Sequence, residues 1–179
     1  MIQIETKRLI LREWLDGDVA PFAKMNSDPR VMEYFPATLS FAETEDLVAR
    51  FRRHFLEHGF GLFALELKDS KEFIGFVGLS VPQFEAHFMP AVEIGWRIAS
   101  KHFGQGYATE AAREVLEFAW GELHLKEVVS FTTESNLASR RVMEKIGMVR
   151  DVKDDFLHPK LDENHRLSKH VLYRIANLK

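Results

Sequence analysis

Two glycines separated by a single residue, Gly104 and Gly106, are the positions in this sequence that most clearly suggest chemistry. They follow an apolar segment typical of a buried strand, and small residues that favour a helix come directly after them. Glycine permits positive φ, and the first turn of a helix carries unpaired N–H groups, so such a turn can direct several donors at one anion. The stretch therefore predicts a site for a diphosphate-bearing cofactor. A tight turn that binds nothing is the alternative.

This turn must be positioned by neighbouring elements, and hydrophobic periodicity predicts where they begin and end. A capping box at Ser40 and Glu43 and stop signals at Gly59 and Gly147 mark helix boundaries. Strand and helix patterns interleave without a linker or repeat, which indicates one α/β or α+β domain over residues 1–179. Strands are expected over 2–13, as one strand or two, and over 60–67, 73–81, 91–98, 127–133, 148–154 and 168–175, with helices over 19–25, 41–58, 108–121 and 137–146.

The composition excludes several classes of function. The net charge of −3 argues against a general nucleic-acid binder, and 46% hydrophobic residues are ordinary for a globular domain. The absence of cysteine excludes disulfides and thiolate metal ligands, and it fits a reducing cytoplasm. No apolar run suits a signal peptide or a membrane span, so we expect a cytoplasmic protein without a membrane partner. His54 and His58 stand four residues apart without an evident third ligand, so no metal is expected.

Three blocks of sequence resemble the GNAT (Gcn5-related) N-acetyltransferase superfamily, in particular its RimJ/RimL-like branch. Residues 103–108 resemble the acetyl-coenzyme A motif Gln/Arg-x-x-Gly-x-Gly/Ala, with Phe103 where Gln or Arg is usual. Residues 133–148 resemble the signature Asn-x-x-Ser-x-x-Val-x-Glu-Lys-x-Gly, and residues 5–12 resemble the usual first strand. The resemblance implies a splayed central sheet that is mixed but mostly antiparallel, with about six to seven strands flanked by about four helices.

The resemblance also implies which residues bind acetyl-CoA. Asn136 matches a position that hydrogen-bonds the cofactor arm, although a plain helix N-cap explains the same residue, and Ser139 lies one turn beyond it. Arg140, with Arg141 and Lys145, is expected either to meet the 3′-phosphate or to form a solvated helix face. The backbone of Ile98 and Ala99 is expected to pair with the pantetheine arm, and the pyrophosphate is expected at Phe103, Gly104, Gln105, Gly106, Tyr107, Ala108 and Thr109.

The activity implied is transfer of an acetyl group from acetyl-CoA to a primary amine by direct attack, which requires a base and a proton for the departing thiolate. Glu93 is the candidate base, because partial burial on its strand would raise its pKa. An ion pair of Glu93 with Arg97 or another cation is the structural alternative. Met143 stands where many GNAT enzymes have an acidic Tyr, so either Ser139 or a water serves, or the thiolate leaves unprotonated.

The amine acceptor is not identified by any motif. Tyr34, Phe35, Phe84 and His158 are expected to line its pocket, because GNAT acceptor sites draw on these regions. The acceptor is either a protein N-terminus or a small-molecule amine, and a homodimer is possible. The competing hypothesis is a CoA-binding sensor or interaction module with little turnover, for which the absence of Tyr at Met143 is the sequence support.

Overall fold

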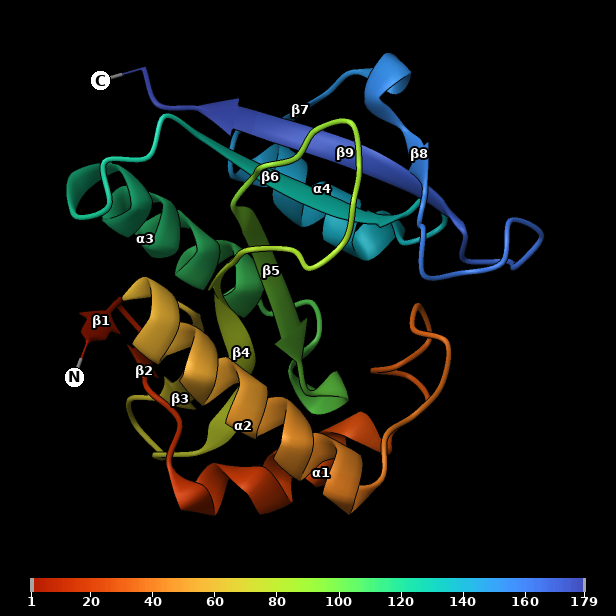
Figure 1. Ribbon diagram of the computed structural model, residues 1–179. Coiled ribbons are helices and arrows are strands. Elements are labelled where there is room, and N and C mark those ends of the chain that lie inside the picture. The colour runs from red at the N-terminus through yellow and green to blue at the C-terminus, as the bar shows by residue number, and fades with distance from the viewer. Residues whose placement is uncertain (1, 179) are drawn as a thin grey trace.

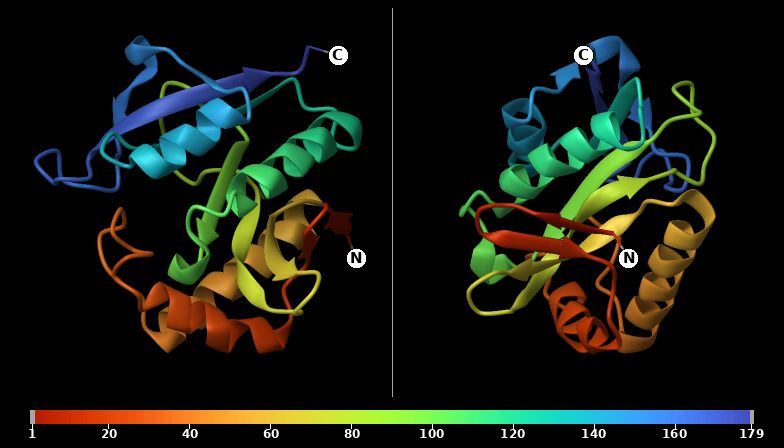
Figure 2. Two further views of the ribbon diagram at one scale, coloured as in Figure 1. Left: turned by 180° about the vertical axis from the view of Figure 1, so that it is seen from behind. Right: turned by 90° about the vertical axis from the view of Figure 1, so that its left-hand side faces the viewer.

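A computed structural model describes residues 2–178, which form one mixed sheet with helices on both sides (Figures 1 and 2). Helices α1 (Val19–Asn26) and α2 (Phe41–His58) lie on one side of the sheet. Helices α3 (Tyr107–Gly121) and α4 (Leu137–Lys145) lie on the other. Within these residues no helix has the length and apolar character needed to span a bilayer.

The first half of the sheet is antiparallel and follows the order of the chain. It consists of β1 (Gln3–Glu5), β2 (Leu9–Arg12), β3 (Leu62–Leu67), β4 (Phe73–Ser80) and β5 (Glu93–Ile98). The helices before β3 begin and end as the sequence predicts. The Ser40 hydroxyl accepts from the Glu43 N–H at 3.3 Å, and the Glu43 carboxylate accepts from the Ser40 N–H at 2.8 Å. Gly59 ends α2 with φ of 74°.

The second half of the sheet is built around a long hairpin. Strand β6 (Glu127–Thr133) pairs along its whole length with β9 (Lys169–Ala176). Two short strands, β7 (Val149–Arg150) and β8 (Phe156–Leu157), also pair with β9. Helix α4 lies between β6 and β7 in the chain, and its N-cap is Asn136, as predicted.

The two halves of the sheet join at one parallel contact and then separate. Strands β5 and β6 pair at Glu93 and Val129, and no further pair between them occurs within residues 2–178. Beyond that contact the strands diverge, which leaves one edge of β5 open (Figure 1). The predicted splay of the central sheet is therefore present, and Glu93 lies at its apex.

The C-terminal region differs from the sequence prediction. The strand expected over 148–154 stops after Arg150, because Asp151 accepts from the Lys153 N–H and begins a 3-10 turn over Val152–Asp154. The loop expected over 155–166 contains β8, a two-residue strand that periodicity cannot detect. With the N-terminal segment divided into two strands, the described residues form nine strands rather than six or seven.

Strand β4 contains an irregularity at Gly75 that brings it unusually close to β5. The register with β3 shifts between Leu65 and Glu66, and Gly75 has φ of 143°. A Cβ at Gly75 would lie 2.0 Å from the carbonyl oxygen of Arg97. The chain thus requires glycine here both for its backbone angles and for the close approach.

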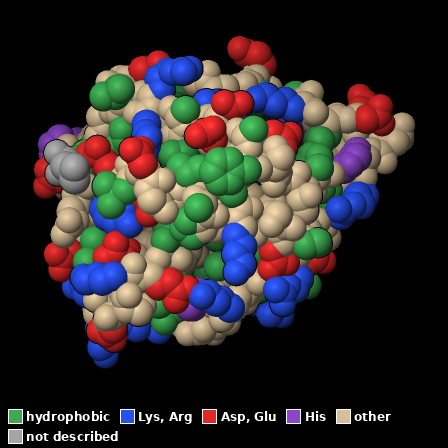
Figure 3. Space-filling model, turned by 90° about the horizontal axis from the view of Figure 1, so that it is seen from below, with side chains coloured by type: hydrophobic (Ala, Val, Ile, Leu, Met, Phe, Trp, Pro, Cys, Tyr) green, Lys and Arg blue, Asp and Glu red, His purple; other side chains and the backbone are tan. Residues whose placement is uncertain are grey.

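The surface seen from below carries charges of both signs. Lys and Arg side chains are interspersed with Asp and Glu side chains around a central hydrophobic patch, and neither sign dominates this face (Figure 3). This mixture agrees with the small net charge of −3. On this face the Lys and Arg side chains form no extended basic surface of the kind that binds nucleic acid.

Candidate active site

The Gly104–Gly106 turn has the geometry that its sequence predicts. Gly104 has φ of 74° and Gly106, the N-cap of α3, has φ of 80°. A Cβ at Gly104 would meet nothing within 4 Å in the described structure, so glycine serves the backbone angle there rather than a lack of space. The N–H groups of residues 104–109 have no acceptor in the part of the chain that the structure describes. They form a row of free donors at a helix N-terminus.

Arg8 holds this turn in place, and sequence reasoning did not single it out. Its Nη2 donates to the Gln105 carbonyl at 3.0 Å, and its guanidinium lies 4.3 Å from the centre of the Tyr107 ring. Its Nε forms an ion pair with Glu110 at 2.7 Å, and Thr6 Oγ1 donates to the same carboxylate at 2.5 Å. No local spacing could reveal these contacts, since about a hundred residues separate the partners.

The predicted cofactor residues around this turn differ in exposure. Phe103 is 51% exposed beside the turn, while Ala108 and Thr109 are half-buried in the first turn of α3. A large ring in solvent is available to a ligand, whereas the half-buried positions present mainly their backbone N–H groups.

The open edge of β5 presents Trp96 and Ile98 rather than Ala99. The Ala99 N–H donates to the Ile74 carbonyl, and the Ala99 carbonyl accepts from the His102 N–H, each at 2.9 Å. Both backbone groups of Ala99 are therefore engaged within the protein. Since neighbouring residues of a strand direct their backbone groups to opposite edges, Trp96 and Ile98 direct theirs toward the opening.

Asn136 and Ser139 belong to a hydrogen-bond network that crosses the opening. Asn136 Oδ1 accepts from the Ser139 N–H at 3.2 Å, and Asn136 Nδ2 donates to Thr132 Oγ1 and to Ser139 Oγ. Trp96 Nε1 donates to the same Ser139 Oγ at 3.3 Å. The N-cap explanation of Asn136 is thus confirmed, and the Ser139 hydroxyl is fixed between β5 and α4.

The remaining predicted positions on α4 have mixed environments. Arg140 donates to the Glu134 carbonyl at 3.0 Å and to the Tyr173 hydroxyl at 3.3 Å, so it is partly committed to structure. Arg141 and Lys145 are exposed. Met143 is 1% exposed and packs in the core, which leaves it no role in proton transfer.

Glu93, the first residue of β5, has a desolvated carboxyl group. Desolvation of its carboxyl group raises its pKa to about 8, although a 3.5 Å hydrogen bond from the Ser80 hydroxyl opposes that rise. Within residues 2–178 no cation forms an ion pair with Glu93. Arg97 instead donates from Nη1 to Asn26 Oδ1 at 2.7 Å, so the alternative of a Glu93–Arg97 ion pair is wrong.

The four predicted acceptor-pocket residues fall into two groups on opposite sides of the opening. Tyr34 and Phe35 lie in the loop between α1 and α2, where the Phe35 ring lies 4.2 Å from the Arg97 guanidinium. Phe84 and His158 lie on the β6–β9 side, with their ring centres 4.8 Å apart. They pack with three half-buried rings, those of Phe131, Phe156 and His170, of which the sequence did not indicate Phe131 and Phe156.

The two sides of the opening are linked by one contact between loops. Arg166, in the loop before β9, donates from Nη2 to the Glu33 carbonyl at 3.0 Å. The two loops lie beside each other next to the opening (Figures 1 and 2). On the β9 side, burial lowers the pKa of His170 to about 4, and burial also lowers the pKa of His158, so this wall is uncharged at neutral pH.

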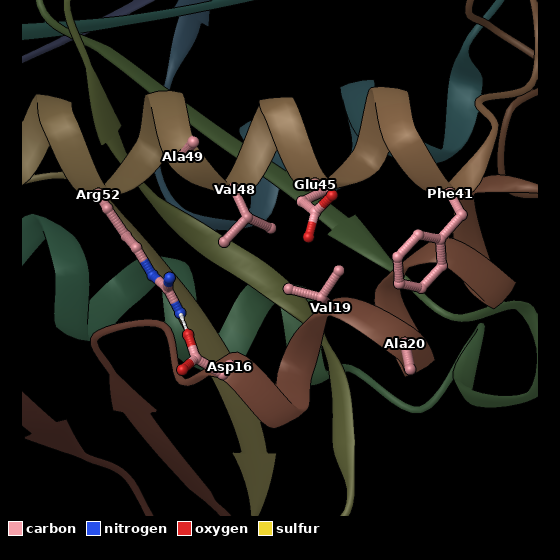
Figure 4. Close-up of a pocket in the computed structure, with 8 residues that line it drawn as sticks. All are labelled: Asp16, Val19, Ala20, Phe41, Glu45, Val48, Ala49 and Arg52. Carbon is pink, nitrogen blue, oxygen red and sulfur yellow. Dashed lines mark hydrogen bonds and ion pairs between the residues drawn. The ribbon is translucent and has the colours of Figure 1, made fainter.

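A separate groove of about 270 Å³ lies between α1 and α2 (Figure 4). Arg52 and Asp16 form an ion pair at one end of it, and Phe41 lies at the other end. None of the sequence-predicted site residues lines this groove. It is therefore distinct from the opening at Glu93.

Comparison with known proteins identifies the family. A family profile described as an acetyltransferase (GNAT) domain matches residues 8–149. The chain belongs to the GNAT acetyltransferase family. It is 35% identical to the uncharacterized protein YkkB of Bacillus subtilis over 147 residues, which are 82% of this chain and 84% of that protein. It is 33% identical to the uncharacterized N-acetyltransferase YnaD of the same organism over 150 residues, with 84% of each chain covered.

A solved GNAT structure supports the same conclusion at the level of the fold. An acetyltransferase of the GNAT family from Bacillus anthracis superposes with a TM-score of 0.80 and 27% identity, covering 98% of both chains. The splayed nine-stranded sheet with four helices is thus the GNAT fold. The chain is an acetyl-CoA-dependent N-acetyltransferase, and GNAT enzymes of this kind use acetyl-CoA and an amine acceptor.

Proposed function

We propose that this GNAT enzyme is of the RimJ/RimL-like type and acetylates a primary amine by direct attack within a ternary complex. The observation that carries the proposal is the placement of Glu93 at the apex of the opening, where β5 and β6 separate. There a carboxyl group with a pKa of about 8 lies beside an unpaired strand edge. The acceptor is a protein N-terminus or a small-molecule amine, and a homodimer is the proposed assembly.

The residues of the opening fit acetyl-CoA. The free N–H groups of residues 104–109 suit a pyrophosphate, and the open edge at Trp96 and Ile98 suits an extended amide-bearing chain. Arg8 stabilises the glycine turn through the Gln105 carbonyl. Asn136 helps to keep the edge of β5 open by holding α4 against β6. To the cofactor-binding residues expected from the sequence, this proposal adds Trp96 and Arg8. It removes the backbone of Ala99, whose N–H and carbonyl groups are engaged within the protein.

Acetyl-CoA supplies an acetyl group activated as a thioester, and CoA leaves as the thiol. Glu93 accepts a proton from the ammonium form of the acceptor, directly or through a water, which gives a neutral amine. The nitrogen forms a bond to the carbonyl carbon, and the carbon–sulfur bond breaks. As this bond breaks, the nitrogen loses its second proton to solvent, and the sulfur gains a proton from a donor group that solvent then reprotonates. A carboxyl group with a pKa of about 8 is well matched to the first transfer at neutral pH.

We assign the proton delivered to the sulfur to Ser139. Its Oγ accepts hydrogen bonds from Trp96 Nε1 and Asn136 Nδ2, at 3.3 and 3.1 Å. Two donors on one oxygen direct the hydroxyl hydrogen elsewhere, and that hydrogen has no acceptor within residues 2–178. Since a thiol has a pKa of about 8.5, the demand on this donor is modest.

Replacement of Ser139 by Ala is expected to lower kcat about tenfold and to leave the KM for acetyl-CoA within about twofold. A thiol of lower pKa is a better leaving group, so a thioester of a more acidic thiol should recover part of the lost rate. Steady-state kinetics with both thioesters measures this. An unchanged kcat for S139A would exclude Ser139 as the proton donor and favour a water.

The proposed activity is tested by thiol release from acetyl-CoA in the presence of a panel of amines. The panel contains polyamines, amino acids, aminoglycosides and short peptides with free N-termini. Turnover with any amine above the rate of acetyl-CoA hydrolysis supports the proposal. Tight CoA binding without turnover on any amine would overturn it and support the sensor or interaction module instead.

A further inference from the structure

Arg97 is half-buried, and its guanidinium has no negative partner in the described chain. Its Nη1 donates to the neutral side chain of Asn26, and its Nε is buried without any partner. No carboxylate pairs with it anywhere in residues 2–178. Burial lowers its pKa to about 10, which still leaves the guanidinium charged at neutral pH. A desolvated cation is normally paired with an anion, so this arrangement requires an explanation.

The unpaired side of the guanidinium is the edge that arginine uses for carboxylates. Nε and Nη2 lie on this edge, and Nη2 also has no partner in the described chain but retains access to solvent. Two other arginines of this protein bind a carboxylate through the same Nε and Nη2 atoms. Arg30 donates from Nε and Nη2 to the two oxygens of Asp28, at 3.0 and 2.8 Å, and Arg150 binds Asp155 in the same way. Nε and Nη2 of Arg97 thus form a carboxylate-binding edge that no group of the described chain occupies, with Nη2 as its solvent-accessible end.

The orientation of this edge is fixed by aromatic rings. The guanidinium lies 4.2 Å from the ring centre of Phe35, and 5.4 and 5.8 Å from those of Phe76 and Phe22. Rings against its face leave its edges as the directions in which it can donate. At one edge Nη1 donates to Asn26, and the edge formed by Nε and Nη2 is the one available to a ligand.

Arg97 shares a strand face with the candidate base. Glu93, Gly95 and Arg97 alternate onto the same face of β5, the face on which α1 lies. A Cβ at Gly95 would approach Glu93 Oε1 at 3.8 Å and no other atom within 4 Å in the described structure. Glu93 Oε1 is thus the only described atom that closely approaches the position a side chain would take at Gly95. Glu93 and Arg97 are four residues apart on one strand, which separates their Cα atoms by about 13 Å. Because both side chains are long, their charged groups can lie closer together than their Cα atoms.

We propose that Arg97 binds a carboxylate of the acceptor, so that the preferred substrate carries an amine and a carboxylate several bonds apart. This inference rests on the proposed acetylation at Glu93. The amine lies at Glu93, the chain of the acceptor passes over Gly95, and the carboxylate meets Arg97 at the solvent-accessible Nη2 end of its carboxylate-binding edge. Phe35, which was expected to line the acceptor pocket, acts by stacking on the guanidinium. Arg97 is thus a specificity residue that does not touch the reacting atoms.

The test compares ω-amino acids of increasing length, from β-alanine to 6-aminohexanoate, with the carboxamide of each. For the wild-type enzyme we expect kcat/KM to favour the best carboxylate over its amide by about ten- to a hundredfold. Arg97→Gln should lower kcat/KM for the carboxylate substrates to about the value for their amides, which abolishes this ratio. Arg52→Gln, which removes an arginine of the distant groove, should keep the wild-type ratio.

A second variant keeps Arg97 and gives its guanidinium a carboxylate partner within the protein. Asn26→Asp places a carboxylate at the 2.7 Å contact with Nη1, so it should reduce the preference for carboxylate substrates while the fold is retained. This variant decides the question if Arg97→Gln fails to fold. Equal kcat/KM for acids and amides in the wild-type enzyme would overturn the inference while leaving the proposed acetylation intact.

A binding measurement separates the two proposals if no amine is acetylated. Calorimetric titration of 6-aminohexanoate and its amide into the CoA-saturated protein reports the carboxylate site directly. Binding of the acid that is lost in Arg97→Gln supports the site even if turnover is absent. Absence of binding, or binding that Arg97→Gln does not change, would overturn the site.

Discussion

Replacement of Glu93 by Gln lowers kcat/KM for the amine acceptor by about two to three orders of magnitude, if Glu93 is the base. Gln has nearly the same shape but cannot accept the proton of an ammonium group. It retains the hydrogen bond with the Ser80 hydroxyl, so the local packing is preserved. The affinity for acetyl-CoA should stay within about twofold, because the free N–H groups of the glycine turn are unaffected.

The substitution of Glu93 by Gln should also change how kcat/KM depends on pH. A base works when deprotonated, so wild-type kcat/KM should rise with pH and level off above about 8, the pKa of Glu93. The Gln variant should lack this step. An acceptor amine with a pKa above about 10 stays in the ammonium form that Glu93 deprotonates throughout this range, so the step at about pH 8 belongs to Glu93. Glu127→Gln, which removes an ion pair with Arg174 at the start of β6, is the control that should retain the full profile.

Stability should change in the opposite direction from activity. The pKa of Glu93 is raised from 4.5 to about 8 on folding, so its protonated form stabilises the protein fully below pH 4.5. This contribution is lost as the pH rises from 4.5 to 8, and the Gln variant does not lose it. Relative to wild type, the variant should therefore gain thermal stability between pH 5 and pH 9. A rate and a pH profile equal to those of wild type would remove Glu93 from the role of base.

Replacement of Gly75 by Ala is the substitution expected to damage the fold most. The new Cβ would lie 2.0 Å from the Arg97 carbonyl oxygen, and the backbone angle of 143° in φ disfavours any L-residue with a side chain. Neither problem is relieved by a rotamer change, since the obstacle is the backbone of β5. We expect the free energy of unfolding to fall by about 3 kcal/mol or more, with a Tm lower by about 10 °C.

Gly121 provides the matched control for this measurement. It is the last residue of α3, and a Cβ there would meet nothing within 4 Å in the described structure. Gly121→Ala should leave the Tm unchanged or raise it slightly, because Ala favours a helix by up to about 1 kcal/mol. Equal Tm values for wild type and Gly75→Ala in thermal unfolding would show that β4 and β5 can separate at low cost.

Local patterns predicted the elements well where their signals lie within a few residues. The capping box at Ser40, the stop at Gly59 and the N-cap at Asn136 are all present where the sequence places them. Such signals are readable because a cap and its partner are at most four residues apart. The two-residue strand β8 escaped prediction, and β7 is shorter than the strand expected over 148–154, because both strands exist through pairing with β9.

For the site, the sequence by itself determined the glycine turn, the residue types at Glu93 and Asn136, and the family that these residues resemble. Only the tertiary structure decided how they combine. The divergence of β5 from β6 frees the edge at Trp96 and Ile98, and the Ile74 and His102 contacts engage Ala99. The physical reason is that backbone angles and caps are local properties. Desolvation of Glu93 and the unpaired charge of Arg97 depend on groups brought together from distant parts of the chain.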